Sequence, residues 1–327
     1  MSTDPSYPGV SVFMTVRNEE RHLRTCVRQI LAQEYAGDLE LFVAVGPSTD
    51  ATARIARELA AERPQVTVVD NPSGLTPNGL NAAIAAAKHD LLVRADGHAL
   101  FPPGYVAEVV RVLDATGAAN VGGRMVPEGT NAFARAVAKA MSSPFGIGGA
   151  AFHTGGDAGP QPTVYLGAFR RDAIEKVGGY DEYFTRAQDW ELNHRIRESG
   201  EVVWFEPGLA VVYHPRDTLK AFARQQFHTG GWRRKVMSKH PESVSLRYLA
   251  PPLVVLASVL GVLVGLVGVF TWPWLMLGLA VPLVYLLGVL VIGWFEGCDL
   301  DPPARRRLPL VMAVMHLSWG AGFLRNA

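Results

Sequence analysis

The chain has 327 residues, of which 49% are hydrophobic, and its formal net charge at pH 7 is +1. A near-neutral charge argues against the basic surface by which nucleic-acid-binding proteins hold phosphates, so we expect no nucleic acid partner. The two cysteines, Cys26 and Cys298, are too few and too far apart for a disulfide framework or a cysteine-rich metal site. The length allows one large folded core followed by an apolar appendix.

Apolar runs alternate with helical patterns from the N-terminus onward. Strands are predicted at residues 10–16, 39–45, 66–69, 91–95 and 119–125, and helices at 20–33, 52–63, 78–88, 105–115 and 189–199. This alternation is typical of an α/β fold with a mostly parallel sheet and helices on both faces. Asn18 is placed to cap the first helix, and the Gly-rich stretch 146–159 reads as either a mobile loop or a long linker.

Residues 249–295 contain no Asp, Glu, Lys, Arg or His. As one helix these 47 residues would be about twice as long as a bilayer of roughly 30 Å requires. We therefore expect two membrane helices, at about 249–270 and 272–295, joined near Trp272. A weaker apolar segment, 308–324, contains Pro309 and His316 and either spans the membrane or lies in its interface.

Basic residues flank the two expected membrane helices on one side. They are Arg233, Arg234, Lys235, Lys239 and Arg247 before the first helix, and Arg305, Arg306 and Arg307 after the second. The positive-inside rule assigns that side to the cytoplasm, and residues 1–9 lack the pattern of a cleaved signal peptide. We expect a tail at residues 1–7, a cytoplasmic domain at 8–239 and an inner (plasma) membrane region at 240–327. A helical hairpin buried in a soluble core is the alternative.

A carboxylate and an imidazole, Asp96 and His98, follow the fourth predicted strand directly. Carboxylates at the ends of parallel strands face the crevice where open α/β sheets bind phosphorylated ligands. The pair could hold a divalent cation, and an imidazole suits Mn²⁺ better than Mg²⁺. Alternatively, His98 only hydrogen-bonds a sugar or a neighbouring carboxylate. Arg94 either reaches a phosphate or pairs with a carboxylate in the core.

Several short segments together resemble the family-two inverting glycosyltransferases with the GT-A fold. In order and spacing, the segments that carry the resemblance are residues 12–20, 48–52, 78–82, 96–98, 167–171, 177–181, 188–193 and 225–233. The likeness is greatest to bacterial membrane-anchored exopolysaccharide glucosyltransferases of the succinoglycan type. In these, Asp-x-His replaces the usual Asp-x-Asp and a hydrophobic tail follows. The resemblance covers nearly the whole chain.

The resemblance implies a nucleotide-sugar donor and a metal ion, Mn²⁺ or Mg²⁺, held by Asp96 and His98. It places the donor against Thr15, Arg17, Glu19, Asp50, Asn78, Asn81, Arg94 and Asp96. The family's usual Asp-Asp-Gly is here Val45-Gly46-Pro47, so one carboxylate expected to read the base is missing. UDP is favoured and GDP stays open. Arg17, Asn78 and Asn81 are alternatively turn and cap residues.

The resemblance also implies that Asp189 is the base that deprotonates the acceptor hydroxyl, on the face opposite the leaving group. An Asp at a helix start is otherwise an N-cap. Glu191 is assigned to catalysis beside it, where it orients a neighbouring Arg or the acceptor. The acceptor side further includes Gln188, Trp190, Gln226, Trp232 and Arg233, with Trp190 as an apolar wall for a sugar face.

Residues 225–233 lie where processive synthases carry Gln-x-x-Arg-Trp, but the spacing differs, so we expect a single transfer. The amphipathic segment 219–237 either lies on the membrane surface or packs as a last helix on the sheet.

The sequence therefore predicts a metal-dependent, inverting hexosyltransferase. Its acceptor would be a polyprenyl-diphosphate-linked saccharide, in cell-envelope or exopolysaccharide synthesis, and its partners would include membrane lipids. One alternative is a polyprenyl-phosphate glycosyltransferase. Another, suggested by the altered Gly46-Pro47 pocket, is a catalytically silent membrane scaffold that binds nucleotide sugars.

Overall fold

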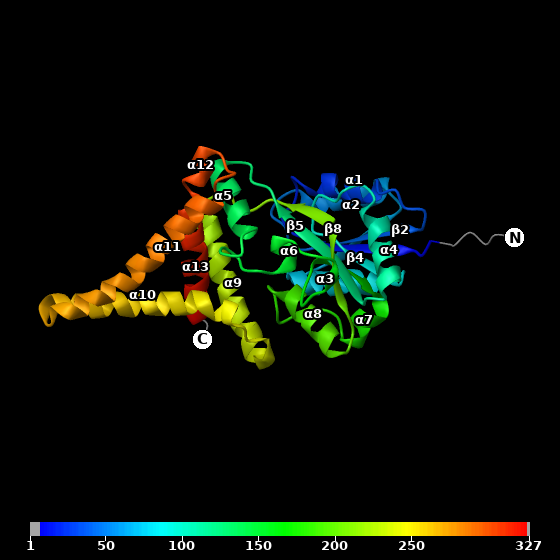
Figure 1. Cartoon of the computed structure of the whole chain (residues 1–327). Coiled ribbons are helices and arrows are strands. Elements are labelled where there is room, and N and C mark those ends of the chain that lie inside the picture. The colour runs from blue at the N-terminus through cyan, green and yellow to red at the C-terminus, as the bar shows by residue number, and fades with distance from the viewer. Residues whose placement is uncertain (1–6, 326–327) are drawn as a thin grey trace. The chain divides into compact units, whose positions relative to one another are not determined.

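The chain folds into two compact units in the computed structural model, which describes residues 7–325 (Figure 1). The first unit comprises the residues up to Val126 together with Ala150–Tyr213. The second comprises Pro127–Gly149 and the residues from His214 onward. The boundaries of these two units do not coincide with the predicted domain boundary between residues 239 and 240. That domain boundary stays a prediction.

The first unit is built on one mixed sheet whose strands lie in the order β3-β2-β1-β4-β7-β5-β8-β6. β1 pairs in parallel with β2 and β4, and β2 with β3, whereas β7 is antiparallel to β4 and β5, and β6 to β8. The strands are β1 (Val10–Val16), β2 (Leu39–Val45), β3 (Val66–Asp70), β4 (Leu91–Arg94), β5 (Asn120–Pro127), β6 (Gly159–Pro160), β7 (Tyr165–Arg170) and β8 (Val203–Tyr213).

Helices cover both faces of this sheet because alternate strand residues point to opposite sides. Val12 and Met14 of β1 pack with α1 (Leu23–Leu31), α2 (Thr52–Glu62) and α4 (Tyr105–Thr116). Phe13 packs on the other face, with α3 (Thr76–Ala86), α7 (Arg171–Lys176) and α8 (Gln188–Glu198). The predicted α/β fold with two helical layers is confirmed, and its parallel half is the half nearest the N-terminus.

Two local predictions were wrong. The first helix begins at Leu23 rather than at residue 20, and Asn18 does not cap it. Asn18 instead has a left-handed backbone (φ 57°), and its Oδ1 accepts a hydrogen bond from the Thr49 amide at 2.8 Å. It therefore joins the loops after β1 and β2. The Gly-rich stretch 146–159 is interrupted by a short helix, α6 (Ala151–Thr154).

The second unit is helical. Its elements are α5 (Ala132–Met141), α9 (Leu219–Lys239), η1 (Pro241–Ser243), α10 (Leu246–Phe270), η2 (Pro273–Leu279), α11 (Ala280–Glu296), α12 (Pro302–Arg305) and α13 (Leu308–Arg325). α10 and the η2–α11 segment form the predicted hairpin, turning at residues 271–272. Their backbones touch near the turn, since a Cβ on Gly261 would lie 2.5 Å from the Gly278 oxygen.

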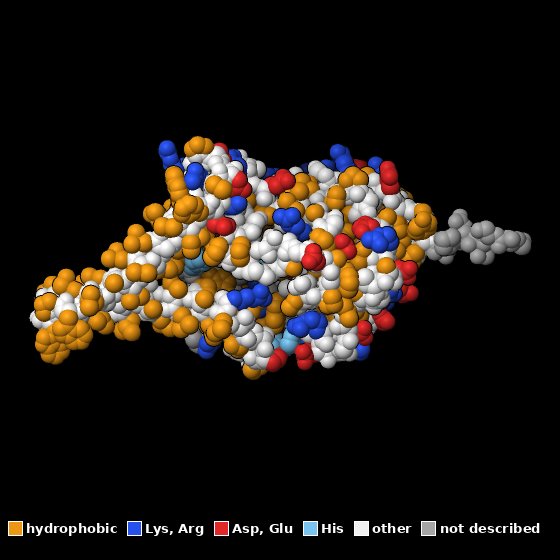
Figure 2. Space-filling model, viewed as in Figure 1, with side chains coloured by type: hydrophobic (Ala, Val, Ile, Leu, Met, Phe, Trp, Pro, Cys, Tyr) orange, Lys and Arg blue, Asp and Glu red, His pale blue; other side chains and the backbone are white. Residues whose placement is uncertain are grey.

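Three helical segments of this unit are long and apolar enough to cross a membrane: Leu246–Phe270, Pro273–Glu296 and Pro302–Arg325. Figure 2 shows hydrophobic side chains along the full visible length of the hairpin. A helix that is apolar all round needs either a protein core or lipid around it, and Leu263 and Leu287 are 55% and 61% exposed. The hairpin is therefore suited to lipid.

Phe13 lies at the centre of the sheet with no exposed surface, and its ring centroid is 6.4 Å from that of Phe169. We expect Phe13→Ala to destabilise the protein by about 4 kcal/mol, the cost of a large core cavity, and to lower the midpoint of thermal unfolding. Val202→Ala, at a position 41% exposed, should leave the midpoint nearly unchanged. Equal midpoints for the two variants would contradict the central packing of Phe13.

Candidate active site

The carboxyl ends of β1 and β4 form the switch point of the sheet. From β1 the chain goes to β2 and β3 on one side and then returns to β4 on the other. Loops that diverge at such a point leave a crevice between them, where α/β proteins bind ligands. Register pairs Phe13 with Arg94, so Thr15 and Asp96 follow on neighbouring strands at this edge.

Arg94 connects the two carboxylates on which the predicted chemistry depends. Its side chain is 6% exposed, and one guanidinium nitrogen lies 3.0 Å from Oδ1 of Asp96. Another forms an ion pair with Oδ1 of Asp189, the second residue of α8. Asp96 and Asp189 keep 27% and 39% of their side-chain surface exposed. A buried cation thus holds two carboxylates that solvent can reach.

Tyr180 completes the surroundings of Arg94. Its buried ring lies 6.0 Å from the guanidinium carbon. Burial alone would lower the pKa of Arg94, but Asp96 and Tyr180 raise it above its usual value, so Arg94 stays charged. In the structure Arg94 pairs with two partly exposed carboxylates of the site rather than with one in the core.

His98 is paired with Glu19 from the loop after β1. Nδ1 of His98 lies 3.0 Å from Oε1 of Glu19, and the two side chains are 39% and 21% exposed. A carboxylate on one ring nitrogen fixes the orientation of the ring and directs the other nitrogen elsewhere, the arrangement common for metal-binding histidines. Asp96 has two carboxylate oxygens, of which Arg94 contacts one. This donor set fits a divalent cation bound by Asp96 and His98.

Cys26 anchors the loop that carries Asp96 and His98. The buried thiol donates a hydrogen bond to the Asp96 carbonyl at 3.3 Å. Burial, with smaller contributions from Asp96 and Glu19, raises the pKa of Cys26 to about 12.

Asp50 is engaged in the loop that precedes α2. Its carboxylate accepts hydrogen bonds from the Thr52 hydroxyl at 2.6 Å, the Thr52 amide at 3.0 Å and the Glu20 amide at 3.2 Å. The Thr52 hydroxyl is the largest cause that lowers the pKa of Asp50. Asp50 thus ties the loop after β1 to the start of α2. Arg17 lies in the loop after β1 and is exposed.

A hollow of about 370 Å³ opens at the ends of β2 and β3. Gly46, Pro47, Arg57, Asp70 and Asn71 are among the residues that line it. Thr15, predicted to contact the donor, borders this region, because its hydroxyl accepts a hydrogen bond from Asn71 at 3.2 Å. Asp70 therefore supplies a carboxylate next to Gly46 and Pro47, where the family's usual acidic residues are missing.

Asn78 and Asn81 of α3 hold the loop that carries Tyr180. Asn81 donates to the Tyr180 carbonyl at 2.8 Å and accepts from its amide at 2.9 Å. Asn78 donates to Glu182 at 2.6 Å. Gly79 lets α3 approach β1, since a Cβ there would lie 2.2 Å from Oγ1 of Thr15. In the structure these asparagines position a loop of the site.

Glu191 is fully buried and forms a two-pronged ion pair with Arg195, at 2.8 and 2.7 Å. Arg195 in turn donates to the Val177 carbonyl and, at 2.8 Å, to the Gly179 carbonyl. Glu191 therefore orients a neighbouring arginine, one of the two roles expected for it. Through Arg195 it fixes α8 against the loop before Tyr180.

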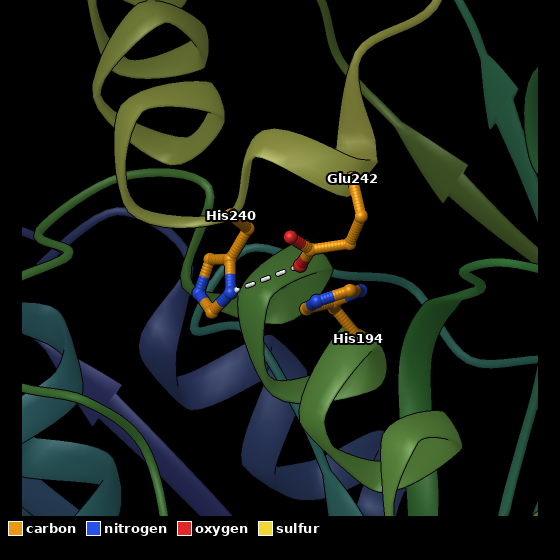
Figure 3. Close-up of side chains that lie close together, drawn as sticks. All are labelled: His194, His240 and Glu242. Atoms are coloured by element: carbon orange, nitrogen blue, oxygen red, sulfur yellow. Dashed lines mark ion pairs between the residues drawn. The ribbon is translucent and has the colours of Figure 1, made fainter.

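Gln188 begins α8, and the Trp190 ring stacks on His194 one turn further on, with centroids 5.3 Å apart. Figure 3 draws His194 on this helix and, in the second unit, an ion pair between His240 and Glu242. Nδ1 of His240 lies 3.5 Å from Oε1 of Glu242, just after α9.

The remaining predicted acceptor residues lie on α9 in the second unit. Gln226 is buried. Nζ of Lys235 lies 4.0 Å from the centre of the Trp232 ring, and the Arg233 guanidinium lies 4.1 Å from that of Tyr248. The contact between Arg233 and Tyr248 stabilises the start of α10 against α9.

Residues 8–230 match the protein family described as "Glycosyltransferase like family 2". The match covers more than half of the chain, so the protein belongs to this family and is a glycosyltransferase.

Individual relatives agree with this assignment. The chain is 32% identical over 312 residues to the succinoglycan biosynthesis protein ExoA of Rhizobium meliloti (strain 1021), covering 94% of this chain and 92% of that protein. It is 28% identical over 201 residues to the beta-monoglucosyldiacylglycerol synthase of Synechocystis sp., covering 60% of this chain and 41% of that protein.

A solved structure confirms the fold. Mannosyltransferase PcManGT from Pyrobaculum calidifontis, in complex with GDP-Man and Mn²⁺, aligns with a TM-score of 0.61 and 18% identity. The alignment covers 98% of this chain and 88% of that one. This likeness confirms the predicted GT-A fold, and the family match and the similarity to ExoA confirm the predicted family.

Sequence reasoning missed four residues that organise the site: Arg57, Asp70, Tyr180 and Arg195. Tyr180 stands inside one of the family-like segments, residues 177–181, which was a usable signal. Arg195 follows Glu191 by four residues on the predicted helix, the spacing of a helical ion pair. Arg57 and Asp70 gave no local signal, because they line one hollow only where α2 packs on β3.

Removing Glu191 should unfold the site rather than only slow its chemistry. We expect Glu191→Ala to destabilise the protein by about 3 kcal/mol, because it leaves Arg195 without its buried partner. Thermal unfolding measures the loss. Glu175→Ala is the matched control, since it removes a 62%-exposed carboxylate paired four residues from Arg171 and should have almost no effect. A Glu191→Ala protein as stable as the control variant would contradict this role.

Proposed function

We propose that this glycosyltransferase moves one hexose from a nucleotide sugar, with inversion, to a lipid-linked saccharide at a membrane. The observation that carries the proposal is Arg94, which joins Asp96, at the donor edge of the sheet, to Asp189, at the start of α8. Donor and acceptor chemistry then meet at one buried cation. The similarity to ExoA supports a role in exopolysaccharide or cell-envelope synthesis.

The donor's nucleoside would occupy the hollow at the ends of β2 and β3, with its diphosphate toward Asp96. Asp70 could accept hydrogen bonds from the base, in place of the carboxylate missing at Gly46-Pro47. UDP is the expected nucleotide, and the GDP-Man held by PcManGT keeps GDP in the test panel.

A divalent ion, Mn²⁺ or Mg²⁺, would be held by Asp96 and His98. When bound, it would neutralise charge that builds on the leaving diphosphate. The chain's own residues do the rest. Glu19 holds the His98 ring, Cys26 anchors the connecting loop, and Arg94 keeps the carboxylate of Asp96 in place.

Asp189 would accept the proton of the acceptor hydroxyl. The hydroxyl oxygen then forms a bond to the anomeric carbon, while the bond from that carbon to the diphosphate oxygen breaks on the opposite face. Arg94 forms an ion pair with Asp189 and so fixes the position of its carboxylate. Glu191 acts on this geometry indirectly, through Arg195 and the loop before Tyr180.

The hairpin and its flanking charges support a proposed placement in the membrane. We propose that α10 and α11 cross the inner membrane with the catalytic unit on the cytoplasmic side, because basic residues flank both open ends of the hairpin. A polyprenyl-linked acceptor would present its sugar at that surface.

Asp189→Asn should lower the release of nucleoside diphosphate by about 10²–10⁴-fold, the usual contribution of a general base, and Asp96→Ala should abolish it. The assay uses detergent-purified protein with Mn²⁺, a panel of UDP- and GDP-sugars and a lipid extract. Asp114→Asn, an exposed carboxylate on α4, should behave as wild type.

The outcomes separate the candidate functions. Substantial release by Asp189→Asn would favour transfer to a polyprenyl phosphate, whose acceptor needs less help from a base. Steady release by the wild-type protein rules out the silent scaffold. Nucleotide binding without release from any donor would contradict the proposed transfer.

Glu19→Gln should weaken Mn²⁺ binding by about 10–100-fold, the usual effect of removing a carboxylate that supports a histidine ligand. Titration calorimetry or the Mn²⁺ magnetic resonance signal measures this without turnover. Glu34→Gln, an exposed change, serves as the control. Equal Mn²⁺ affinity in the two variants would mean that His98 does not bind the metal.

A further inference from the structure

The last apolar helix, α13, differs from the two helices of the hairpin in what surrounds it. Of its most apolar stretch, 39% is buried inside the protein, against 17% for α10 and 6% for the segment of α11. Length and composition alone would allow all three to cross a membrane. The share of each helix that is buried in the protein distinguishes α13 from the other two.

α13 touches the open end of both hairpin helices. Near its start, Pro309 meets Gly293 of α11, where a Cβ on the glycine would lie 3.0 Å from the proline Cα. Near its end, Gly320 meets Pro251 of α10, where a Cβ would lie 2.5 Å from the proline oxygen. Eleven residues of helix, roughly 16 Å, separate the two contacts.

The open ends of the hairpin lie at one membrane surface if α10 and α11 each cross once. A helix that reaches from one open end to the other must run along that surface rather than through the bilayer. Figure 1 shows this arrangement, with α13 crossing the base of the α10–α11 hairpin.

α9 gives a second, independent reason. α13 packs along α9 with the backbones in contact: a Cβ on Gly230 would lie 1.9 Å from the Trp319 oxygen, and one on Gly322 1.9 Å from the Phe227 oxygen. α9 carries six basic residues and no acidic one: Lys220, Arg224, Arg233, Arg234, Lys235 and Lys239. Each would cost about 3 kcal/mol at the centre of a membrane helix. A helix packed along α9 therefore stays with it outside the hydrocarbon.

Ion pairs with α5 hold the link that leads into α13. Arg135 and Lys139 of α5 bind Asp301 and Asp299, in the link from α11 to α13, at 2.7 and 2.8 Å. His316, midway along α13, lies with Nε2 2.8 Å from the Phe145 carbonyl, in the loop after α5. These polar contacts belong to a layer that water reaches.

We propose that α13 lies in the plane of the membrane interface, across the base of an inserted α10–α11 hairpin. The chain then crosses the membrane twice, and its C-terminus is on the same side as α9. The partner of this layer is a lipid surface. Leu310 of α13, 51% exposed, faces outward beside the exposed basic residues Arg306 and Arg307, a pattern that suits acyl chains and anionic headgroups.

Sidedness of labelling tests this topology in the full-length protein. A membrane-impermeant maleimide is applied to intact cells and to inside-out vesicles. Wild-type protein reports Cys298, in the exposed link after α11, because Cys26 is buried. In a Cys298→Ala background, Trp272→Cys marks the turn of the hairpin, and Leu310→Cys and Arg325→Cys mark the two ends of α13.

We expect Cys298, Leu310→Cys and Arg325→Cys to react on one side and Trp272→Cys on the other. A reporter fused to the C-terminus provides an independent measure and should agree with Arg325→Cys. If Arg325→Cys and the C-terminal reporter are found on the same side of the membrane as Trp272→Cys, α13 spans the membrane and the proposal is wrong. Reaction of all positions on one side would show that the hairpin does not cross, which also overturns it. Neither result depends on activity.

Discussion

Burial of the Arg94 guanidinium at the carboxyl edge of the sheet is the interaction on which the site depends. A charge taken out of water requires close partners, and here they are Asp96 and Asp189, which lie far apart in the chain. The cation therefore brings the loop after β4 and the start of α8 to one point. Replacing it would leave both carboxylates without their shared cation, so the same substitution would affect folding and the proposed chemistry together.

The part of the site around the start of α8, where we propose acceptor chemistry, is held by several linked contacts rather than by one bond. Glu191 forms an ion pair with Arg195, and Arg195 donates hydrogen bonds to the carbonyls of Val177 and Gly179. Asn81 hydrogen-bonds both the amide and the carbonyl of Tyr180. The contacts of Arg195 join α8 to the loop before Tyr180, and the contact of Asn81 joins α3 to the same loop. The loop is consequently rigid where it borders Arg94. A rigid frame around two reacting partners reduces the cost of aligning them.

Local patterns were sufficient for much of the fold and for part of the site. β1 and β2 end where the apolar runs of the sequence predicted, and Asp96 follows β4 as strand-end carboxylates do. Contacts between residues far apart in the chain could not be predicted, because nothing local marks Arg94 as the partner of Asp189 or places Asp70 beside Gly46 in one hollow. The Asn18 cap failed because a contact with the next loop competes with the helix for its side chain. The third apolar segment was left undecided, since composition does not record that Gly230 and Gly322 press α9 and α13 together.

The Cys26 thiol has a consequence for how turnover responds to pH. With a pKa near 12, it keeps its proton throughout the range in which proteins are handled, so its hydrogen bond to the Asp96 carbonyl does not titrate. The loop that presents Asp96 and His98 is thus anchored by a pH-independent contact. A change of rate between mild acid and mild alkali therefore does not report on release of this anchor.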